Sequence, residues 1–185
     1  MNKKTIWILI LIIIIGAGYW FISKSPASQE KNDSSSNADF NPKNATYNID
    51  GASVTLVNGE AETEIVAGSA SKISTWYFGN VSYGDLTFDG KDDMAYLIAQ
   101  NTGGTGVFYY AVVAIKTDDG YKLTNTFFVG DRIAPQTTEI NTSAGELRVN
   151  FAERKKGEPM TADPSVGVTL LLKVTAEGVL EGLMR

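Results

Sequence analysis

The chain has 185 residues, a length typical of one domain, and a formal net charge of −5 from 16 Lys and Arg against 21 Asp and Glu. Its composition, 43% hydrophobic and 20% charged, is that of a globular protein. The acidic balance argues against a nucleic-acid partner, which requires a basic surface. Histidine and cysteine are both absent. This excludes Ser-His-Asp and Cys-His catalysis, imidazole and thiolate metal sites, and disulfides.

The N-terminal segment has the pattern of a membrane anchor. Residues 1–4 carry two lysines, and residues 5–22 are uncharged and almost entirely apolar. A helix of that length rises about 27 Å, close to the ~30 Å hydrocarbon core of a bilayer. The lysines predict a cytoplasmic N-terminus. A cleaved signal peptide is the alternative, but its apolar core is usually shorter, so the pattern favours an uncleaved single-pass anchor. In both cases the rest of the chain is exported.

Residues 23–43 are rich in Ser, Asn, Asp and Lys and contain almost no apolar side chains. Such a segment cannot bury enough surface to offset the entropy of ordering it. We expect a flexible linker that holds the following domain roughly 25 Å from the bilayer. The predicted organisation is therefore a cytoplasmic tip (1–4), a transmembrane anchor (5–22), a polar linker (23–43) and an extracytoplasmic domain (44–185).

The domain begins with short runs of β-forming residues divided by turn residues. Residues 53–57 and 62–66 flank Asn58-Gly59, which predicts a hairpin with a type I′ turn because both central residues must adopt positive φ. Residues 67–75 are also expected to be strand. Further along, residues 146–151 and 166–174 alternate between apolar and other side chains, which predicts two half-buried strands.

Two runs, residues 94–99 and 107–115, are apolar on both faces. Because β-branched and aromatic residues dominate them, we expect central strands covered on both sides. Asp119-Gly120 is expected to turn the second run into a strand over 121–129. About eight to ten mostly antiparallel strands predict an all-β sandwich or small barrel, preceded by the one transmembrane helix.

The most specific local pattern follows Gly84, where aspartates occupy positions 1, 5 and 9 of a loop with glycine at position 6. The loop resembles the DxDxDGxxD calcium loop of integrin-type repeats, dockerins and EF-hand proteins. The resemblance implies a weak calcium site whose ligands would be Asp85, Thr87, Asp89, Lys91 through its carbonyl, and Asp93. Position 3 lacks the usual Asp or Asn, and position 12 lacks the bidentate glutamate of a full EF-hand. The alternative is a polar turn whose aspartates cap backbone amides.

Three longer segments, residues 84–115, 130–136 and 153–167, together resemble an uncharacterised family of bacterial envelope domains that are lipoprotein-like or anchored at the N-terminus. The resemblance implies an all-β fold and a bacterial extracytoplasmic location, and it brings no catalytic residues. Two charged clusters, Asp131-Arg132 and residues 153–158, are read either as solvated hairpin tips or as a recognition edge for an anionic partner.

We therefore expect a membrane-anchored binding or envelope-structural module rather than an enzyme. Its expected partners are the bilayer, through residues 5–22, and an envelope protein or polymer. No catalytic residue is predicted, and calcium is the one cofactor indicated. The alternative is a histidine-independent hydrolase that uses carboxylates on a cell-wall or sugar substrate.

Overall fold

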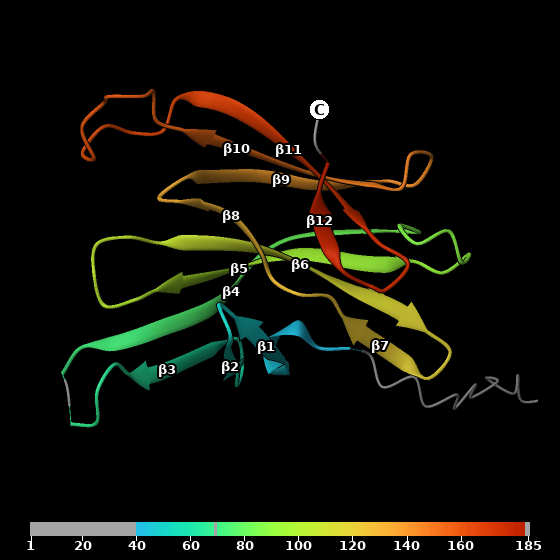
Figure 1. Cartoon of the computed structure of the whole chain (residues 1–185), viewed down its shortest axis with the longest axis horizontal. Coiled ribbons are helices and arrows are strands. Elements are labelled where there is room, and N and C mark those ends of the chain that lie inside the picture. The colour runs from blue at the N-terminus through green and yellow to red at the C-terminus, as the bar shows by residue number, and fades with distance from the viewer. Residues whose placement is uncertain (1–39, 69, 184–185) are drawn as a thin grey trace, which may run out of the picture. The chain divides into compact units, whose positions relative to one another are not determined.

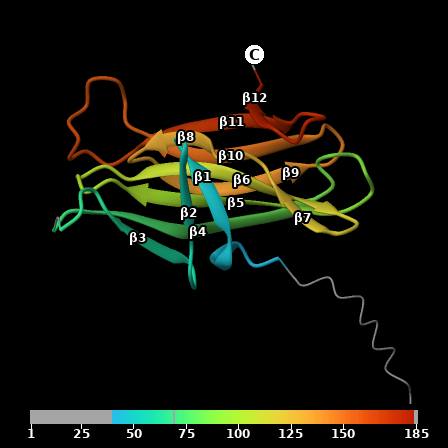
Figure 2. The same cartoon turned by 60° about the horizontal axis from the view of Figure 1, so that its bottom comes forward.

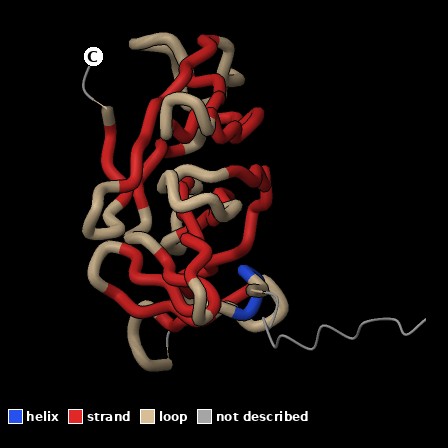
Figure 3. The backbone as a smooth tube through the Cα atoms, turned by 90° about the vertical axis from the view of Figure 1, so that its right-hand side faces the viewer, coloured by secondary structure: helices blue, strands red, loops and turns tan. Residues whose placement is uncertain are grey.

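The computed structural model describes residues 40–68 and 70–183, and within them it is all-β (Figure 1). The single 3₁₀ turn there, η1 (Pro42–Asn44), is the short blue segment in Figure 3. The strands, in chain order, are β1 (Thr46–Ile49), β2 (Ala52–Thr55), β3 (Glu60–Glu64), β4 (Lys72–Gly84), β5 (Asp93–Asn101), β6 (Phe108–Thr117), β7 (Gly120–Leu123), β8 (Phe127–Asp131), β9 (Ala134–Asn141), β10 (Glu146–Glu153), β11 (Val166–Val174) and β12 (Leu180–Gly182).

The predicted transmembrane helix (5–22) and most of the predicted linker lie outside the described residues. Within the described ranges, no helix is both long and apolar enough to cross a membrane. Asn37–Arg185 forms one compact unit. Among the described residues, both hydrophobic cores consist of residues from this unit.

The larger sheet places β5 and β6 at its centre. Its strand order is β3-β4-β5-β6-β7, and β8 pairs with the other end of β6. Nearly every residue of β5 is buried, and β6 is buried over residues 110–114. The prediction that these two apolar runs are central strands covered on both sides is therefore confirmed.

The smaller sheet, with strand order β12-β11-β10-β9, covers one face of the larger sheet. The alternation expected for residues 146–151 is confirmed, because Leu147, Val149 and Phe151 are buried while the residues between them are half-exposed. The core between the sheets contains Leu86, Ala95, Leu97, Ala111, Val113, Ile133, Leu147, Val149, Phe151, Leu172 and Leu180.

The antiparallel ribbon of β1 and β2 covers the opposite face of the larger sheet and runs across its strands in Figure 2. Tyr47 of the ribbon and Tyr96 of β5 meet in this second core, with their hydroxyl oxygens 3.0 Å apart. The Tyr47 hydroxyl also donates to the Pro42 carbonyl at 2.6 Å. The ribbon is thus fixed to the sheet by polar as well as apolar contacts.

The hairpin predicted around Asn58-Gly59 is present only as its turn, which a single antiparallel bridge between Val57 and Glu60 closes, and the two predicted strands do not pair beyond it. Asn58 and Gly59 have φ of 56° and 95°, as a type I′ turn requires. The strands on either side, however, belong to different sheets, since β2 pairs with β1 and β3 pairs with β4. The turn leads the chain from the covering ribbon to the edge of the larger sheet. Asp50-Gly51, which also has positive φ at both residues, joins β1 to β2.

Two other predicted strands have different limits. The expected strand over 121–129 is divided into β7 and β8, which both pair with β6. Thr124 follows β7, and its hydroxyl accepts a hydrogen bond from the Val113 amide at 3.1 Å. Of the expected strand over 67–75, only the part from Lys72 onward is β structure.

Candidate functional site: the aspartate loop and the lysine groove

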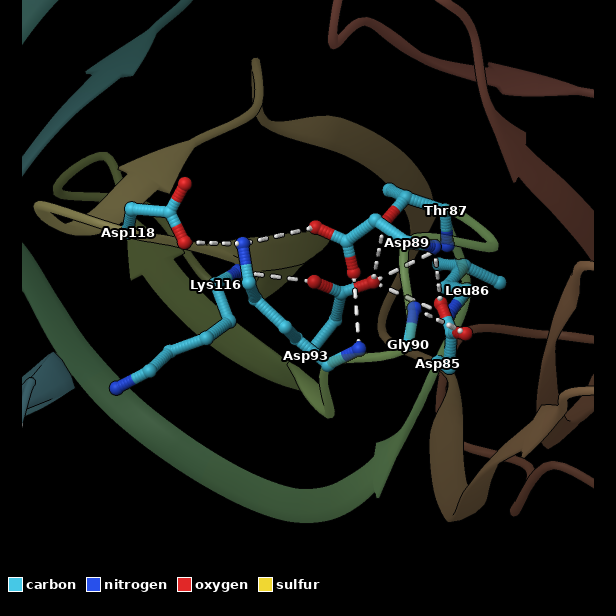
Figure 4. Close-up of polar contacts among 9 residues, drawn as sticks. Asp85, Leu86, Thr87, Asp89, Gly90, Asp93, Lys116 and Asp118 are labelled. Carbon is cyan, nitrogen blue, oxygen red and sulfur yellow. Dashed lines mark hydrogen bonds and ion pairs between the residues drawn. The ribbon is translucent and has the colours of Figure 1, made fainter.

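The predicted calcium ligands lie in the loop between β4 and β5, which we call the aspartate loop (residues 85–93) (Figure 4). Asp85 accepts hydrogen bonds from the amides of Asp89 at 3.1 Å and Gly90 at 2.9 Å. Asp89 accepts one from the Lys91 amide at 3.0 Å. These are local side-chain-to-backbone bonds of the kind that fold polar turns.

Asp93 has no exposed surface. Hydrogen bonds from several parts of the loop converge on its carboxylate. Its Oδ2 accepts hydrogen bonds from the Leu86 and Thr87 amides at 3.0 and 3.2 Å and from the Thr87 hydroxyl at 3.3 Å. Its Oδ1 accepts one from the Lys116 amide of β6 at 2.9 Å. Burial raises the pKa of Asp93, and these hydrogen bonds oppose the rise. Asp93 therefore fastens the loop to the centre of the sheet.

All five predicted calcium ligands are thus brought into one loop, and the three aspartates all accept backbone N–H bonds. Within the ranges that the structure describes, no group of three or more acidic side chains is arranged to hold a metal ion. Asp93 has no exposed surface and already accepts four hydrogen bonds, which favours the capping role over coordination of an ion. The calcium site stays a prediction, and the capping role of the aspartates accounts for the contacts present.

Lys91 connects the aspartate loop to the hairpin between β6 and β7. Its Nζ lies 2.8 Å from Oδ1 of Asp118 and 3.7 Å from Oδ2 of Asp89. The hydrogen bond from Lys91 lowers the pKa of the Asp118 carboxyl, and the same bond raises the pKa of Lys91. Figure 4 shows the carboxylates of Asp118 and Asp89 beside the Asp93 bonds. The carboxyl of Asp118 is therefore held in its ionised form.

Phe88 connects the aspartate loop to the turn between β9 and β10. Its backbone has φ of 62°, an uncommon value for an aromatic residue, and its side chain is 66% exposed. The ring lies directly against Gly145, where an added Cβ would come within 2.5 Å of Phe88 Cε2. Gly145 also has positive φ (61°), so both its backbone conformation and its lack of a side chain are needed here.

A cavity of about 640 Å³ lies beside the aspartate loop. Four segments line it: the aspartate loop, the β6–β7 hairpin, the β9–β10 turn and the β11–β12 turn. Because these segments come from both sheets, the cavity forms where the two sheets end together. We call it the lysine groove, after the side chains described next.

Three lysines that line the groove come from three different elements: Lys91 from the aspartate loop, Lys122 from β7 and Lys173 from β11. Lys122 donates to the Glu177 carbonyl at 3.2 Å. Lys173 forms an ion pair with Glu181 at 3.1 Å, with both side chains 47% exposed. A fourth lysine, Lys116, also lines the groove, and its ammonium lies 4.4 Å from the centroid of the Tyr121 ring and away from Asp93 (Figure 4).

The two charged clusters singled out in the sequence meet around a second, smaller cavity of about 320 Å³. Arg132 binds Asp131 through two nitrogens, at 2.9 and 2.6 Å from Oδ2. Arg154 donates to the carbonyl oxygens of Arg132, at 2.9 Å, and Ala162. Arg154 therefore joins the β8–β9 turn to the long β10–β11 loop, and these charges are engaged with one another.

Comparison of the chain with known protein families, curated proteins and solved structures finds no match. The fold and the two cavities define an all-β domain with a groove lined by lysines at one end. The sequence analysis did not predict that Lys91, Lys122 and Lys173 would line one cavity. Lys122 and Lys173 stand at polar positions of alternating strands, where a charged residue is the ordinary choice for a solvated face.

Proposed function

We propose that the protein is a membrane-anchored extracytoplasmic binding module that holds an anionic ligand in the lysine groove. The observation that carries the proposal is the convergence of Lys91, Lys122 and Lys173 on one cavity in a chain whose net charge is −5. Two of these lysines are paired with carboxylates, Lys91 with Asp118 and Asp89 and Lys173 with Glu181, so an anionic ligand would replace these carboxylates as the partner of the ammonium groups. The groove volume of about 640 Å³ is also in the range of small-ligand sites.

The charges in the groove favour binding over hydrolysis. A carboxyl that acts as a general acid needs a raised pKa and access to the substrate. The pKa of Asp118 is instead lowered by Lys91, so this carboxyl is ionised at neutral pH. Asp93 has a raised pKa but no exposed surface. These two aspartates support the binding module over the hydrolase that uses carboxylates.

Titration of the isotope-labelled unit Asn37–Arg185 with glycerol phosphate tests the groove. NMR resonances of Lys91, Lys122 and Lys173 should shift, whereas those of Lys155 and Lys156 near the second cavity should not. Replacement of Lys122 and Lys173 by Gln should weaken the response without lowering the melting temperature, because both side chains are at the surface. Absence of any shift at millimolar phosphate ester would overturn the proposal.

The anchor has a separate test, because it rests on residues 5–22 and on the resemblance to bacterial envelope domains. Protease treatment of intact bacterial spheroplasts should remove the domain and leave a small stub in the membrane. Recovery of a soluble protein that begins near Gln29 would show instead that the N-terminal segment is cleaved.

A further inference from the structure

The outer edge of β2 in the covering ribbon is unpaired. The sheet of the ribbon contains only β1 and β2, and next to it the Leu56 amide donates to the Ala45 carbonyl at 3.0 Å. Bonded and non-bonded pairs alternate along an antiparallel ladder, so the backbone groups of Ser53 and Thr55 point away from β1. In the described part of the chain, these outward N–H and C=O groups have no hydrogen-bond partner. Figures 1 and 2 show β2 on the side of the ribbon toward β3, and β1 on the side toward β7.

The two edges nearest to β2 are protected, whereas β2 is not. On the β1 side of the ribbon, the Asn48 carbonyl accepts a hydrogen bond from the Thr126 hydroxyl at 2.7 Å, which ties that edge to the larger sheet. Strand β3, at the end of the larger sheet, carries Glu60, Glu62 and Glu64, charges of the kind that discourage further pairing. Strand β2 reads Ala-Ser-Val-Thr and carries no charge. Of these three edges, β2 is therefore the one open to another strand.

A cavity of about 300 Å³, which we call the edge cavity, lies along β2. Three consecutive residues of β2, 52–54, line it, although neighbouring side chains of a strand point to opposite faces. The edge cavity therefore follows the backbone of β2. The larger sheet supplies its floor, with Thr63 of β3, Ile73 of β4 and Gln100 of β5. A strand added beside β2 would thus place alternate side chains in the cavity.

Gln100 lines the edge cavity and has unused hydrogen-bonding capacity. The residue is 7% exposed, and its Nε2 donates to the Thr75 hydroxyl at 3.0 Å. Within the described residues, no hydrogen bond reaches its Oε1. Buried side-chain carbonyl groups are ordinarily hydrogen-bonded. The free Oε1 therefore indicates that a donor from outside the domain completes this site.

We propose that the edge cavity binds an extended, uncharged segment of a partner protein, which adds to the ribbon as a third strand beside β2. Backbone bonds to Ser53 and Thr55 supply the affinity, and a side chain that enters the cavity supplies the selectivity. Val54 and Ile73 offer apolar surface, and the Oε1 of Gln100 offers an acceptor. A side chain that combines a methyl group with a hydrogen-bond donor, such as threonine, suits this combination.

The edge cavity is a site separate from the lysine groove. Asp93 begins β5 beside the aspartate loop, whereas Gln100 lies near the other end of the same strand. Seven residues of a strand span about 23 Å. A second copy of the chain would offer its own β2, but that edge has its own larger sheet beneath it. A free extended segment fits between β2 and the floor without this obstruction.

The test is an NMR titration of the isotope-labelled full chain in detergent with the capped peptide acetyl-Ser-Thr-Val-Thr-Val-Thr-Ser-amide. The peptide is uncharged, so the net charge of −5 does not attract it. Resonances of Ser53, Thr55 and the Gln100 side-chain amide should shift, whereas those of Lys122 and Lys173 should not. When about nine-tenths of the protein is bound, hydrogen exchange of the Ser53 and Thr55 amides should slow about ten-fold, because only the free fraction exchanges.

Ala52→Leu fills the edge cavity from an exposed position and should abolish the response. Ala134→Leu, at an exposed alanine of β9, is the matched control and should leave it unchanged. Ser53→Pro removes one outward N–H at an edge position that tolerates proline, and it should weaken binding about five-fold. Unchanged melting temperatures show that the variants fold.

Three results would overturn the proposal. The first is the absence of any shift at millimolar peptide, and the second is equal binding by Ala52→Leu and the natural protein. The third is slow exchange of the Ser53 and Thr55 amides before the peptide is added, since the edge would then be filled by this protein itself. None of these results bears on the lysine groove, which glycerol phosphate tests separately.

Discussion

The side-chain amide of Asn125 pairs with the backbone of Leu180 in the way that a neighbouring strand would. Its Oδ1 accepts a hydrogen bond from the Leu180 amide at 2.7 Å, and its Nδ2 donates to the Leu180 carbonyl at 3.1 Å. Asn125 lies between β7 and β8 of the larger sheet, and Leu180 begins β12 of the smaller one. At another edge, the Ile140 amide of β9 donates to the Ser82 hydroxyl of β4 at 2.9 Å. Side chains thus connect the two sheets at both places.

We predict that Asn125→Ala lowers the free energy of unfolding by about 1–3 kcal/mol, because it leaves the amide and carbonyl of a buried residue without partners. Denaturant unfolding of the unit Asn37–Arg185 measures the change. Asn150→Ala is the matched control, since its side-chain amide bonds to exposed threonine side chains on the outer face of the smaller sheet. Equal losses from the two substitutions would contradict the role assigned to Asn125.

Asp93→Asn should also destabilise the domain, by about 1–3 kcal/mol at neutral pH. The carboxylate accepts bonds on both oxygens, whereas an asparagine would turn an NH₂ group toward N–H donors. The loss should appear as a lower midpoint in denaturant. Asp92→Asn, outside these contacts, should unfold like the natural protein, and a shared midpoint for all three proteins would rule out this role for Asp93.

The raised pKa of Asp93 predicts the pH dependence of its contribution. Because the carboxyl binds its proton more tightly in the folded state, its contribution to stability is greatest below the unfolded pKa of 3.8. The contribution decreases as the pH rises through the folded pKa. The stability of the natural protein minus that of Asp93→Asn should therefore decrease as the pH rises above 3.8. A difference that increases with pH over this interval would mean that the pKa is lowered instead.

The two-sided burial of β6 predicts a sharp difference between two charge substitutions. Val112 has no exposed surface, so Val112→Asp should cost several kcal/mol and prevent stable folding. Arg148 of β10 has a side chain that is 41% exposed, and Arg148→Asp should change the stability by less than ~1 kcal/mol. Thermal melts compare the two. Similar sensitivity at both positions would show that the assigned faces are wrong.

The calcium hypothesis makes its own thermal prediction. With a dissociation constant of about 0.5 mM and calcium at about 2 mM, binding would raise the free energy of unfolding by about 0.9 kcal/mol. For a domain of this size the melting temperature should rise by about 2–5 °C. Asp89→Ala should remove the rise, and Asp92→Ala should retain it. Identical melting temperatures in EDTA and in millimolar calcium would leave Asp85, Asp89 and Asp93 as capping residues only.

The central strands could be predicted from sequence because their burial on both faces determines the type of residue at every position. A strand buried on both faces must be apolar throughout, as residues 94–99 and 107–115 are. The path after Asn58-Gly59 could not be predicted in this way. A turn fixes the local direction of the chain. The pairing of β3 with β4, however, depends on contacts with residues that come later in the sequence. The lysine groove was missed for a related reason, since its lysines are far apart in the chain and follow no local pattern.

The attachment of the β1–β2 ribbon has a mechanical consequence for a tethered domain. Tension on the N-terminal side would reach the domain at Phe40 and η1, which precede β1 directly. The first contacts to bear the load would be the Tyr47 bond to Pro42 and the packing of Phe40 against Tyr96 and Tyr121. The ribbon could then peel from one core while the core between the two sheets, with the lysine groove at its end, remains assembled.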